Sequence, residues 1–460
     1  MKNTKKVAFR NLGCKVNEYE MEVMQQRMAE NGFLVVPFDT KADIYVINTC
    51  TVTNIADRKS RQMLHRAKKE NPDAIVVAVG CYVQTDKEGA LKDSAVDLCI
   101  GNNKKSEIAE IITEFIKKKE HTSDKKSLKT LMDTTVTDIN AYAEYEEMSL
   151  KRTAEHTRAF VKIQDGCNQF CSYCAIPLAR GRIRSRKPDD VINEVTTLSE
   201  NGYTEVVING IHLSSYGLDF HPTDTGRVPS YNEVAKDGYF NKDLIDVLKL
   251  IEKVPGIERI RLGSLEPRLV TEEFVKELKS IKAICPQFHL SLQSGCDVTL
   301  ERMNRKYSTD EYRNAVRILR EAFDNPAITT DVIVGFPGET DEEFEISKAF
   351  VSEIGFYEPH IFRYSRRKNT AADKMPNQIP EEIKAKRSEE LISIGEELSD
   401  KFRKSFIGKN VEVLFEEGKN GEYTGHTKEY IKVGMRSLED LSGKTLNLLL
   451  DGTTLYFVGK

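Results

Sequence analysis

The sequence predicts an α/β protein. It begins with an open parallel α/β domain, continues into a partial (β/α)6 barrel of the TIM type and ends in a small antiparallel β-barrel. Apolar runs typical of buried strands alternate with helical stretches up to about residue 118 and again from about 153 to 385, which indicates two domains with parallel sheets. After residue 398, Gly-Lys, Gly-Glu and Asp-Gly turns separate five short strand candidates. A chain of 460 residues suffices for two to four domains.

Three apolar runs in the first domain predict buried parallel strands, and a cysteine follows the end of each run. The strands are expected at residues 7–12, 44–48 and 75–79, with helices such as 18–31 and 57–70 after them. The cysteines are Cys14, Cys50 and Cys81. Because ligands of open α/β sheets bind outside the carboxyl ends of the strands, the three thiols are expected to converge and to hold an iron–sulfur cluster. The alternative is three buried structural cysteines, since cysteine is often buried.

The remainder of the N-terminal third lies outside this site. Cys99 falls inside the apolar run 96–100 and is assigned to the core. Residues 119–152 lose the alternation, because the stretch is polar and rich in Thr and Lys. We expect it to be a linker.

The composition limits where the protein acts and what it binds. The N-terminus has basic residues but no apolar core of a secretory signal, and no run of about 18 apolar residues could span a membrane. These features predict a cytoplasmic protein. In that reducing compartment, the nine cysteines are more often metal ligands or free thiols than disulfides. With a net charge of -4, nucleic-acid binding would have to come from local basic patches.

Six strand–helix units are expected in the central domain. The strands are predicted at residues 160–164, 205–209, 259–262, 288–293, 330–335 and 360–364, and the helices between them include 188–201, 243–254, 271–281 and 309–322. Function in such a barrel lies on the loops at the carboxyl ends of the strands. A polar insert at 218–242 follows the second strand and is expected over the same face, as a lid or a partner loop. The tail strands are expected at 411–416, 423–427, 430–434, 445–450 and 454–458, after a connecting helix near 381–404.

A compact cysteine loop follows the first strand of the central domain. Its residues Cys167, Cys171 and Cys174 have the spacing C-x₃-C-x₂-C. A 4Fe–4S cluster takes four thiolates, so three leave one iron open for a small molecule. The alternative is a structural zinc knuckle, but zinc normally needs a fourth Cys or His at short spacing, and none lies close by.

Two basic patches are candidates for phosphate contacts. Four arginines alternate after the cysteine loop, at Arg180, Arg182, Arg184 and Arg186. In an extended segment they would share one face and could grip RNA phosphates. Arg366 and Arg367, after the sixth strand, form the second patch. The alternative for both patches is an ordinary solvated face.

Several stretches together carry a resemblance to one known family. They are LGCKVNEYE (12–20), NTCTVTNIADRKSRQ (48–62), VGCYVQ (79–84), DGCNQFCSYC (165–174), GIHLSSYG (210–217), GSLEP (263–267), SLQSGCD (291–297) and DVIVGFPGET (331–340). Through these stretches, nearly the whole chain resembles the methylthiotransferases of the radical S-adenosylmethionine (radical SAM) superfamily. The resemblance implies an N-terminal methylthiotransferase domain with an auxiliary cluster (1–118), a linker (119–152), a radical SAM core (153–385) and an RNA-binding TRAM domain (398–460).

The resemblance also implies the reaction. In this family the cluster on the compact loop, here Cys167, Cys171 and Cys174, reduces S-adenosylmethionine to give a 5′-deoxyadenosyl radical that abstracts the hydrogen at C2 of a modified adenine beside the anticodon. The second 4Fe–4S cluster, on the strand-end cysteines, presents a sulfur that another S-adenosylmethionine methylates. A purine C2–H is not acidic enough for a side-chain base, so a cofactor must carry the radical chemistry. The implied partners are the tRNA anticodon stem-loop and a flavodoxin- or ferredoxin-like electron donor.

The motif around the first cysteine bears on the substrate. Its sequence Gly-Cys-Lys-Val-Asn (13–17) most resembles the branch that acts on N6-threonylcarbamoyladenosine in tRNA. The branch that acts on N6-isopentenyladenosine usually has Gly-Cys-Gln-Met-Asn there, and it is the alternative. The same chemistry could also methylthiolate a ribosomal protein. A non-catalytic iron–sulfur protein that binds RNA would differ from all three, and the open iron argues against it.

The superfamily also implies contacts to S-adenosylmethionine. Tyr173 is expected near the adenine, and Asn209 and Gly210, after the second strand, near the methionyl amino group. The remaining expected contacts are Gln293 and Ser294, near the ribose, and Gly335, at the start of the segment 335–338 where backbone can approach the adenine. The alternative for each glycine is an ordinary turn after a strand.

Overall fold

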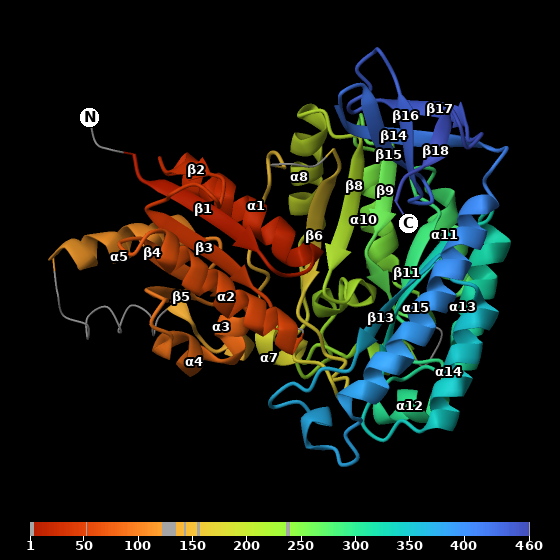
Figure 1. The fold of residues 1–460 in the computed structure, drawn as a ribbon, viewed down its shortest axis with the longest axis horizontal. Coiled ribbons are helices and arrows are strands. Elements are labelled where there is room, and N and C mark those ends of the chain that lie inside the picture. Colours follow the sequence, from red (N-terminus) through yellow and green to blue (C-terminus); the bar gives the residue numbers. More distant parts are fainter. Residues whose placement is uncertain are drawn as a thin grey trace. The chain divides into compact units, whose positions relative to one another are not determined.

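The computed structural model describes residues 4–51, 53–121, 135–141, 144–153, 157–235 and 240–459. The chain folds into two compact units (Figure 1). The first unit comprises Met1–Leu150, Gln164–Arg186 and Ser365–Asp373, and the second comprises Lys151–Ile163, Lys187–Tyr364 and Lys374–Lys460. Residues 122–134 and 142–143 of the expected linker, and 236–239 of the expected insert, lie outside the described residues. No helix in the described part of the chain is long and apolar enough to cross a membrane.

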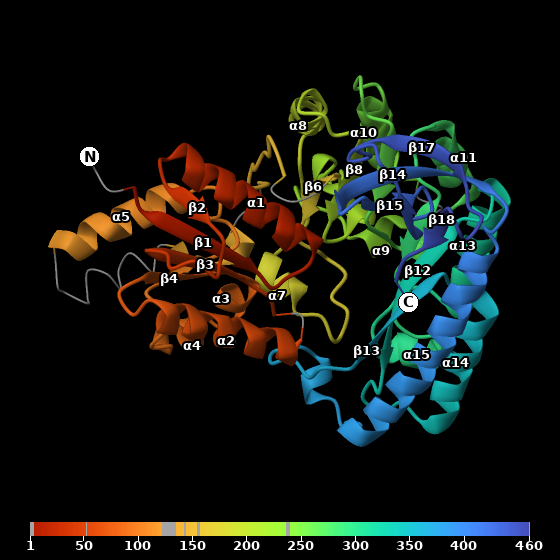
Figure 2. The same cartoon turned by 45° about the horizontal axis from the view of Figure 1, so that its top comes forward.

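The first unit is built on a five-stranded parallel sheet with the order β2-β1-β3-β4-β5. Its strands are β1 (Lys6–Asn11), β2 (Leu34–Val36), β3 (Ile44–Thr49), β4 (Ile75–Gly80) and β5 (Leu98–Ile100). Its helices are α1 (Lys15–Glu30), α2 (Asn54–Glu70), α3 (Cys81–Thr85), α4 (Lys87–Lys92) and α5 (Ile108–His121). Helices α1 and α5 cover one face of the sheet, and α2, α3 and α4 cover the other (Figure 2). Strands β3 and β4 are buried along their whole length, as expected for a sheet covered on both faces.

Two four-stranded sheets carry the central part of the chain, in the orders β7-β6-β8-β9 and β10-β11-β12-β13. The strands are β6 (Ala159–Asp165), β7 (Arg184–Ser185), β8 (Glu205–Gly210), β9 (Arg259–Leu262), β10 (Ser264–Leu265), β11 (Gln287–Leu290), β12 (Ala327–Val334) and β13 (Glu358–Arg363). A parallel bridge between Ile260 and Ile284 links the two sheets, so the six expected strands follow one another in chain order. The partial barrel predicted from the sequence is confirmed.

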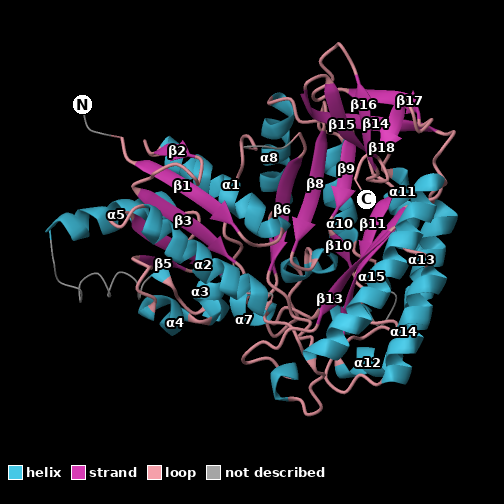
Figure 3. Cartoon of the chain, in the orientation of Figure 1, coloured by secondary structure: helices cyan, strands magenta, loops and turns pink. Residues whose placement is uncertain are grey.

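Helices alternate with these strands along the chain (Figure 3). They are α7 (Ile176–Arg180), α8 (Pro188–Glu200), α9 (Tyr231–Val234), α10 (Lys242–Glu252), α11 (Glu272–Ser280), α12 (Asp297–Arg302), α13 (Thr309–Ala322) and α14 (Asp341–Ile354). Side chains cap several of them, and at α13 and α14 a Ser or Thr is paired with a Glu in a capping box. These caps fix the first residue of each helix, shortly after the loop that follows the preceding strand.

The C-terminal strands form a curled antiparallel sheet with the order β17-β14-β15-β16-β18. The strands are β14 (Asn410–Lys419), β15 (Glu422–Thr427), β16 (Lys432–Arg436), β17 (Thr445–Leu449) and β18 (Leu455–Phe457), and α15 (Glu381–Lys404) precedes them and packs along β13. Val413, Phe415 and Val433 lie in its core. Strands β17 and β18 are the two edges of this order, so the predicted small barrel is an open half-barrel.

Two buried arginines of β9 fasten this half-barrel to the partial barrel within the second unit. Arg259 Nη2 donates to Glu412 O at 2.8 Å, and Arg261 Nη1 donates to Lys428 O at 2.9 Å. Both guanidinium groups also contact the fully buried carboxylate of Glu205, at 3.5 and 3.0 Å. Burial alone would raise the pKa of Glu205, but Arg261 and Arg259 hold that pKa below its ordinary value. Glu205 therefore remains ionised between two cations.

Candidate active site

The three strand-end cysteines lie at one edge of the sheet of the first unit. Strands β1, β3 and β4 are neighbours, and their register pairs Asn11 with Asn48 and Thr49 with Gly80. The cysteines that follow these strands are Cys14, Cys50 and Cys81. Each cysteine comes within three residues after one of these paired strand-end residues. Because neighbouring strands are about 4.8 Å apart, the three segments that carry the cysteines lie close together.

The second cysteine triad lies on the loop between β6 and α7, in the same compact unit as the first. Its members are Cys167, Cys171 and Cys174, with the partly buried Tyr173 before the last of them. The backbone N–H of Cys167 donates to Gly181 O at 3.0 Å and closes the loop at its start. Gly166 has φ +70°, and a Cβ there would lie 1.7 Å from Arg182 O. Glycine is therefore required directly before the first cysteine of the loop.

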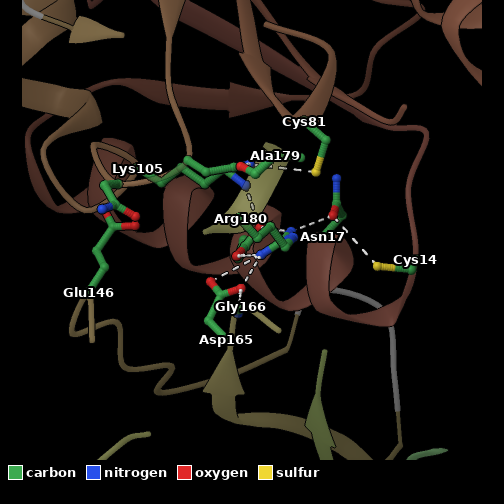
Figure 4. A network of polar contacts seen from close by, with 12 residues as sticks. Cys14, Asn17, Cys81, Lys105, Glu146, Asp165, Gly166, Ala179 and Arg180 are labelled. Carbon is green, nitrogen blue, oxygen red and sulfur yellow. Dashed lines mark hydrogen bonds and ion pairs between the residues drawn. The ribbon is translucent and has the colours of Figure 1, made fainter. Parts of the chain in front are cut away.

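A buried arginine joins segments that lie next to both triads (Figure 4). Arg180, the last residue of α7, donates from Nη1 to Glu20 Oε1 at 2.7 Å and to both carboxylate oxygens of Asp165 at 3.1 Å. Its Nη2 donates to Glu20 Oε2 at 2.9 Å and to Asn17 Oδ1 at 2.7 Å. Lys105 pairs with Glu20 as well. Burial alone would lower the pKa of Arg180, but Asp165 and Glu20 raise it, so the guanidinium remains charged.

Polar groups around Arg180 reach the sulfurs of the first triad. The thiol of Cys14 donates to Asn17 Oδ1 at 3.6 Å, the oxygen that also accepts from Arg180. Asn102 Nδ2 donates to Cys81 Sγ at 3.6 Å and to Ala179 O at 2.6 Å. Figure 4 shows both sulfurs directed toward this network. Helix α7, which follows the second triad, is thus linked to the sulfurs of the first triad through two side chains. Asn17 contacts both Arg180 and Cys14, and Asn102 contacts both Ala179 and Cys81.

The donors around the sulfurs fit iron–sulfur clusters. The side-chain amide of Asn102 and the backbone N–H of Gln169 point at Cys81 Sγ and Cys167 Sγ, the latter at 3.4 Å. Such N–H···S contacts stabilise thiolate ligands and tune cluster potentials. Within the described ranges, no group of three or more His, Cys, Asp or Glu side chains is arranged to hold a metal ion. The roles of both triads as cluster ligands therefore stay predictions.

Three of the four alternating arginines lie in the interior. Arg180 belongs to the network above, Arg184 donates from Nη1 to Asn103 Oδ1 at 2.6 Å, and Arg186 pairs with Glu147. None of the three side chains is more than 1% exposed. The predicted row of RNA-facing arginines is wrong for these three, because each guanidinium is buried against polar groups from distant parts of the sequence.

The remaining arginines of the predicted patches differ in exposure. Arg182 is exposed, and its guanidinium carbon lies 4.5 Å from the centre of the Phe170 ring in the cysteine loop. Arg366 is exposed as well, and RNA contacts of these two residues stay predictions. Arg367 is 7% exposed and pairs with Asp57 at 2.6 Å, so it has a structural partner inside the first unit.

The residues expected to bind S-adenosylmethionine in the second unit lie at the carboxyl ends of strands. Asn209 and Gly210 end β8, Gln293 and Ser294 follow β11, and Gly335 follows β12. Gln293 has φ +68° and is held by a parallel bridge to the neighbouring strand β12. A non-glycine residue in this conformation is strained and is typical of functional sites. The cofactor contacts of these residues stay predictions.

Two buried carboxylates that were not predicted from the sequence lie near the same strand ends. Glu266, after β10, lies 2.9 Å from Arg305 Nη2 and 3.6 Å from His212 Nε2. Glu339, after β12, accepts from Arg387 Nη1 at 2.7 Å. Burial alone would raise the pKa of Glu266, but Arg305 and His212 lower it, whereas burial raises the pKa of Glu339. A carboxylate inside a Gly- and Pro-containing strand-end motif, GSLEP or GFPGET, is the signal that could have identified them.

Comparisons with known proteins agree with this architecture. The model of the radical SAM superfamily matches residues 161–351, and the model described as uncharacterized protein family UPF0004 matches residues 6–101. The fold is shared with the radical S-adenosylmethionine methyltransferase TsrM from Kitasatospora setae, with a TM-score of 0.55 and 16% identity, covering 80% of this chain and 77% of that one. The barrel and its three-cysteine loop define this protein as a radical SAM enzyme.

Relatives with known names show to which family of radical SAM enzymes the chain belongs. The chain is 36% identical to the threonylcarbamoyladenosine tRNA methylthiotransferase MtaB of Bacillus subtilis (96% of this chain, 93% of that one) and 39% identical to the MtaB of Aquifex aeolicus (88% and 90%). It is 32% identical to the tRNA-2-methylthio-N(6)-dimethylallyladenosine synthase of Clostridium novyi (95% and 92%). The chain belongs to the radical SAM methylthiotransferase family. This membership indicates S-adenosylmethionine and an iron–sulfur cluster as its cofactors.

Proposed function

We propose that this enzyme transfers a methylthio group to C2 of N6-threonylcarbamoyladenosine beside the anticodon of tRNA. The observation that carries this proposal is the similarity, at 33–39% identity over at least 88% of the chain, to four relatives that bear the name threonylcarbamoyladenosine tRNA methylthiotransferase. Relatives named for the dimethylallyladenosine product match at 31–35% identity, so methylthiolation of N6-isopentenyladenosine is the second candidate.

Two 4Fe–4S clusters would serve this reaction, one on each cysteine triad. The bound clusters and S-adenosylmethionine supply the radical and the methylthio group. The chain's own residues hold the ligand segments: Arg180 clamps α1, which follows Cys14, to the end of the helix that follows Cys174. The placement of both triads in one compact unit supports a reaction in which the two sites act on the same substrate atom.

The partners follow from the same chemistry. A flavodoxin- or ferredoxin-like protein would supply the electrons, because a radical SAM reaction starts with a one-electron reduction. The anticodon stem-loop of tRNA would be the substrate, bound in part by the C-terminal half-barrel. We place the reaction in the cytoplasm, where tRNA is modified.

Mass spectrometry of nucleosides tests the proposal. tRNA from a strain that lacks this gene should lose 2-methylthio-N6-threonylcarbamoyladenosine and accumulate its precursor without the methylthio group. Restoring the gene should restore the product, and restoring it with Cys167→Ala should not. Loss of the isopentenyl product instead would favour the second candidate. Unchanged tRNA together with an altered ribosomal protein would refute both.

A further inference from the structure

A pocket of about 340 Å³ in the first unit is lined in part by residues that directly follow members of both cysteine triads. Three of its lining residues, Thr51, Tyr82 and Ala175, directly follow predicted cluster ligands. Those ligands are Cys50, Cys81 and Cys174. The volume falls in the lower range of small-ligand sites. A group in this pocket would therefore contact the segments that carry the predicted ligands of both clusters, which in the proposed function act on the C2 atom of the substrate.

The pocket is lined by an excess of cations. Arg61 and Lys368 are exposed, and neither has a carboxylate within salt-bridge distance among the residues that the structure describes. Each of the two carboxylates of the pocket has one partner. Asp57 pairs through Oδ2 with the buried Arg367 at 2.6 Å, and Asp86, the N-cap of α4, accepts on Oδ1 from the backbone N–H of Gly89 at 3.1 Å. Arg61 hydrogen-bonds the Tyr82 hydroxyl rather than a carboxylate, so both exposed cations can receive an anion.

Neutral polar groups complete the lining. Arg61 lies 5.9 Å from the centre of the Tyr82 ring, whose hydroxyl is a neutral hydrogen-bonding group. The hydroxyl of Thr51 lies 3.3 Å from that of Thr85, and Asn54 anchors Arg367 at 2.7 Å. A ligand with one carboxylate and further hydroxyl or amide groups matches this lining.

We propose that this pocket binds the threonylcarbamoyl group of the substrate, with Arg61 and Lys368 on its carboxylate. This inference rests on the proposed function and deepens it, because it names the determinant of substrate choice. An isopentenyl group has no charge or hydrogen-bonding atom, and it would desolvate both cations without giving them a partner. The pocket therefore selects for the threonylcarbamoyl substrate and against the isopentenyl one.

Three synthetic anticodon stem-loops that differ only in the N6 substituent of the adenosine test this inference. The substituents are threonylcarbamoyl, isopentenyl and none, and Kd and kcat/KM are measured with anaerobically reconstituted enzyme. Arg61→Ala and Lys368→Ala should each weaken binding of the threonylcarbamoyl RNA by about 10- to 100-fold, the loss of one charge-assisted hydrogen bond. Binding of the unsubstituted RNA should not change. Arg61→Lys, which keeps the charge, should retain most of the affinity and guards against a folding defect.

The matched control is Lys59→Ala, an exposed cation on the same helix α2 that does not line the pocket. It should leave discrimination between the three RNAs unchanged. Equal losses for all three RNAs in the Arg61 and Lys368 variants would mean that these cations hold the RNA backbone, and unchanged affinities would mean that they touch no substrate; either result overturns the inference. If the wild-type enzyme acts on the isopentenyl RNA and not on the threonylcarbamoyl RNA, the proposed function itself fails.

Discussion

Arg180 and Glu20 form a bidentate ion pair in the interior of the first unit, with Nη1···Oε1 at 2.7 Å and Nη2···Oε2 at 2.9 Å. The two residues are 160 positions apart in the sequence. Glu20 lies on α1, the helix that starts directly after Cys14, and Arg180 ends the helix that follows Cys174. The pair therefore fixes the polypeptide after one predicted cluster relative to the polypeptide after the other.

Replacing Arg180 should destabilise the protein strongly. Arg180→Ala leaves the buried carboxylates of Glu20 and Asp165 without their main partner, which costs about 3–5 kcal/mol. Arg180→Lys should recover only part of this, because an ammonium cannot make the bidentate contact. Urea unfolding of the protein without clusters measures the change. Arg182→Ala, at an exposed neighbour, should stay within about 0.5 kcal/mol of wild type, and equal stability of both alanine variants would contradict the assigned role.

The position of Arg180 shows what the sequence could and could not predict. The main strands and the cysteines at their ends follow from local apolar runs, and the structure places β1, β3 and β4 side by side, as the expected convergence of their ends requires. The burial of Arg180 depends on Glu20, a distant residue, so the alternation of arginines suggested a solvent-facing row instead. The short strands β2, β7 and β10 were missed because two or three residues carry no periodicity.

Arg182 is the remaining candidate for an RNA contact in the cysteine-loop region. Its exposed guanidinium is held over Phe170, so it can meet a phosphate with little loss of side-chain entropy. Arg182→Ala should weaken tRNA binding and reduce the slope of log K against log salt by about one. Arg186→Ala is the contrast, because it should lower stability and leave the slope unchanged. An unchanged slope for Arg182→Ala would mean that Arg182 is an ordinary solvated residue that makes no RNA contact.

The carboxylate of Glu205 should make the second unit sensitive to acid. Because its folded pKa is lowered from 4.5 by Arg261 and Arg259, the stability that it contributes is complete above that value and is lost as the pH falls through the folded pKa. Glu205→Gln should cost about 3–5 kcal/mol at neutral pH, since two buried guanidinium groups lose their counter-ion. The variant should also show a flatter loss of stability below pH 4.5. Glu258→Gln, at an exposed site directly before β9, should change neither the stability at neutral pH nor its loss in acid. A wild-type acid profile in Glu205→Gln would contradict the role assigned to the Glu205 carboxylate.

Iron analysis tests the number of clusters. Anaerobically reconstituted enzyme should bind about eight irons, four for each three-thiolate site. Changing Cys167, Cys171 and Cys174 together to Ala should leave about half of them, and so should the same change of the strand-end triad. Cys99→Ala is the matched control, because this thiol is fully buried in the apolar core of the first unit and lies outside both triads. A wild type that never exceeds four irons would refute the two-cluster prediction.

The two triads should have separable roles. The loop triad lies after the first barrel strand, where radical SAM enzymes cleave their cofactor, and the strand-end triad belongs to the part of the chain that the second family model matches. The variant Cys14→Ala, Cys50→Ala, Cys81→Ala should therefore still cleave S-adenosylmethionine to 5′-deoxyadenosine under reducing conditions, but form no methylthio product. The variant of the loop triad should do neither.

Chromatography of 5′-deoxyadenosine and of digested tRNA separates these outcomes. Because Asn17 and Asn102 connect Arg180 and the Ala179 carbonyl to the sulfurs of Cys14 and Cys81, loss of the strand-end cluster could also disturb the loop that follows the other triad. The spectrum of the remaining cluster is therefore recorded in the same sample. Methylthio product from the strand-end variant would show that sulfur does not pass through that site. Loss of cleavage with an intact spectrum would show that the two sites are not independent.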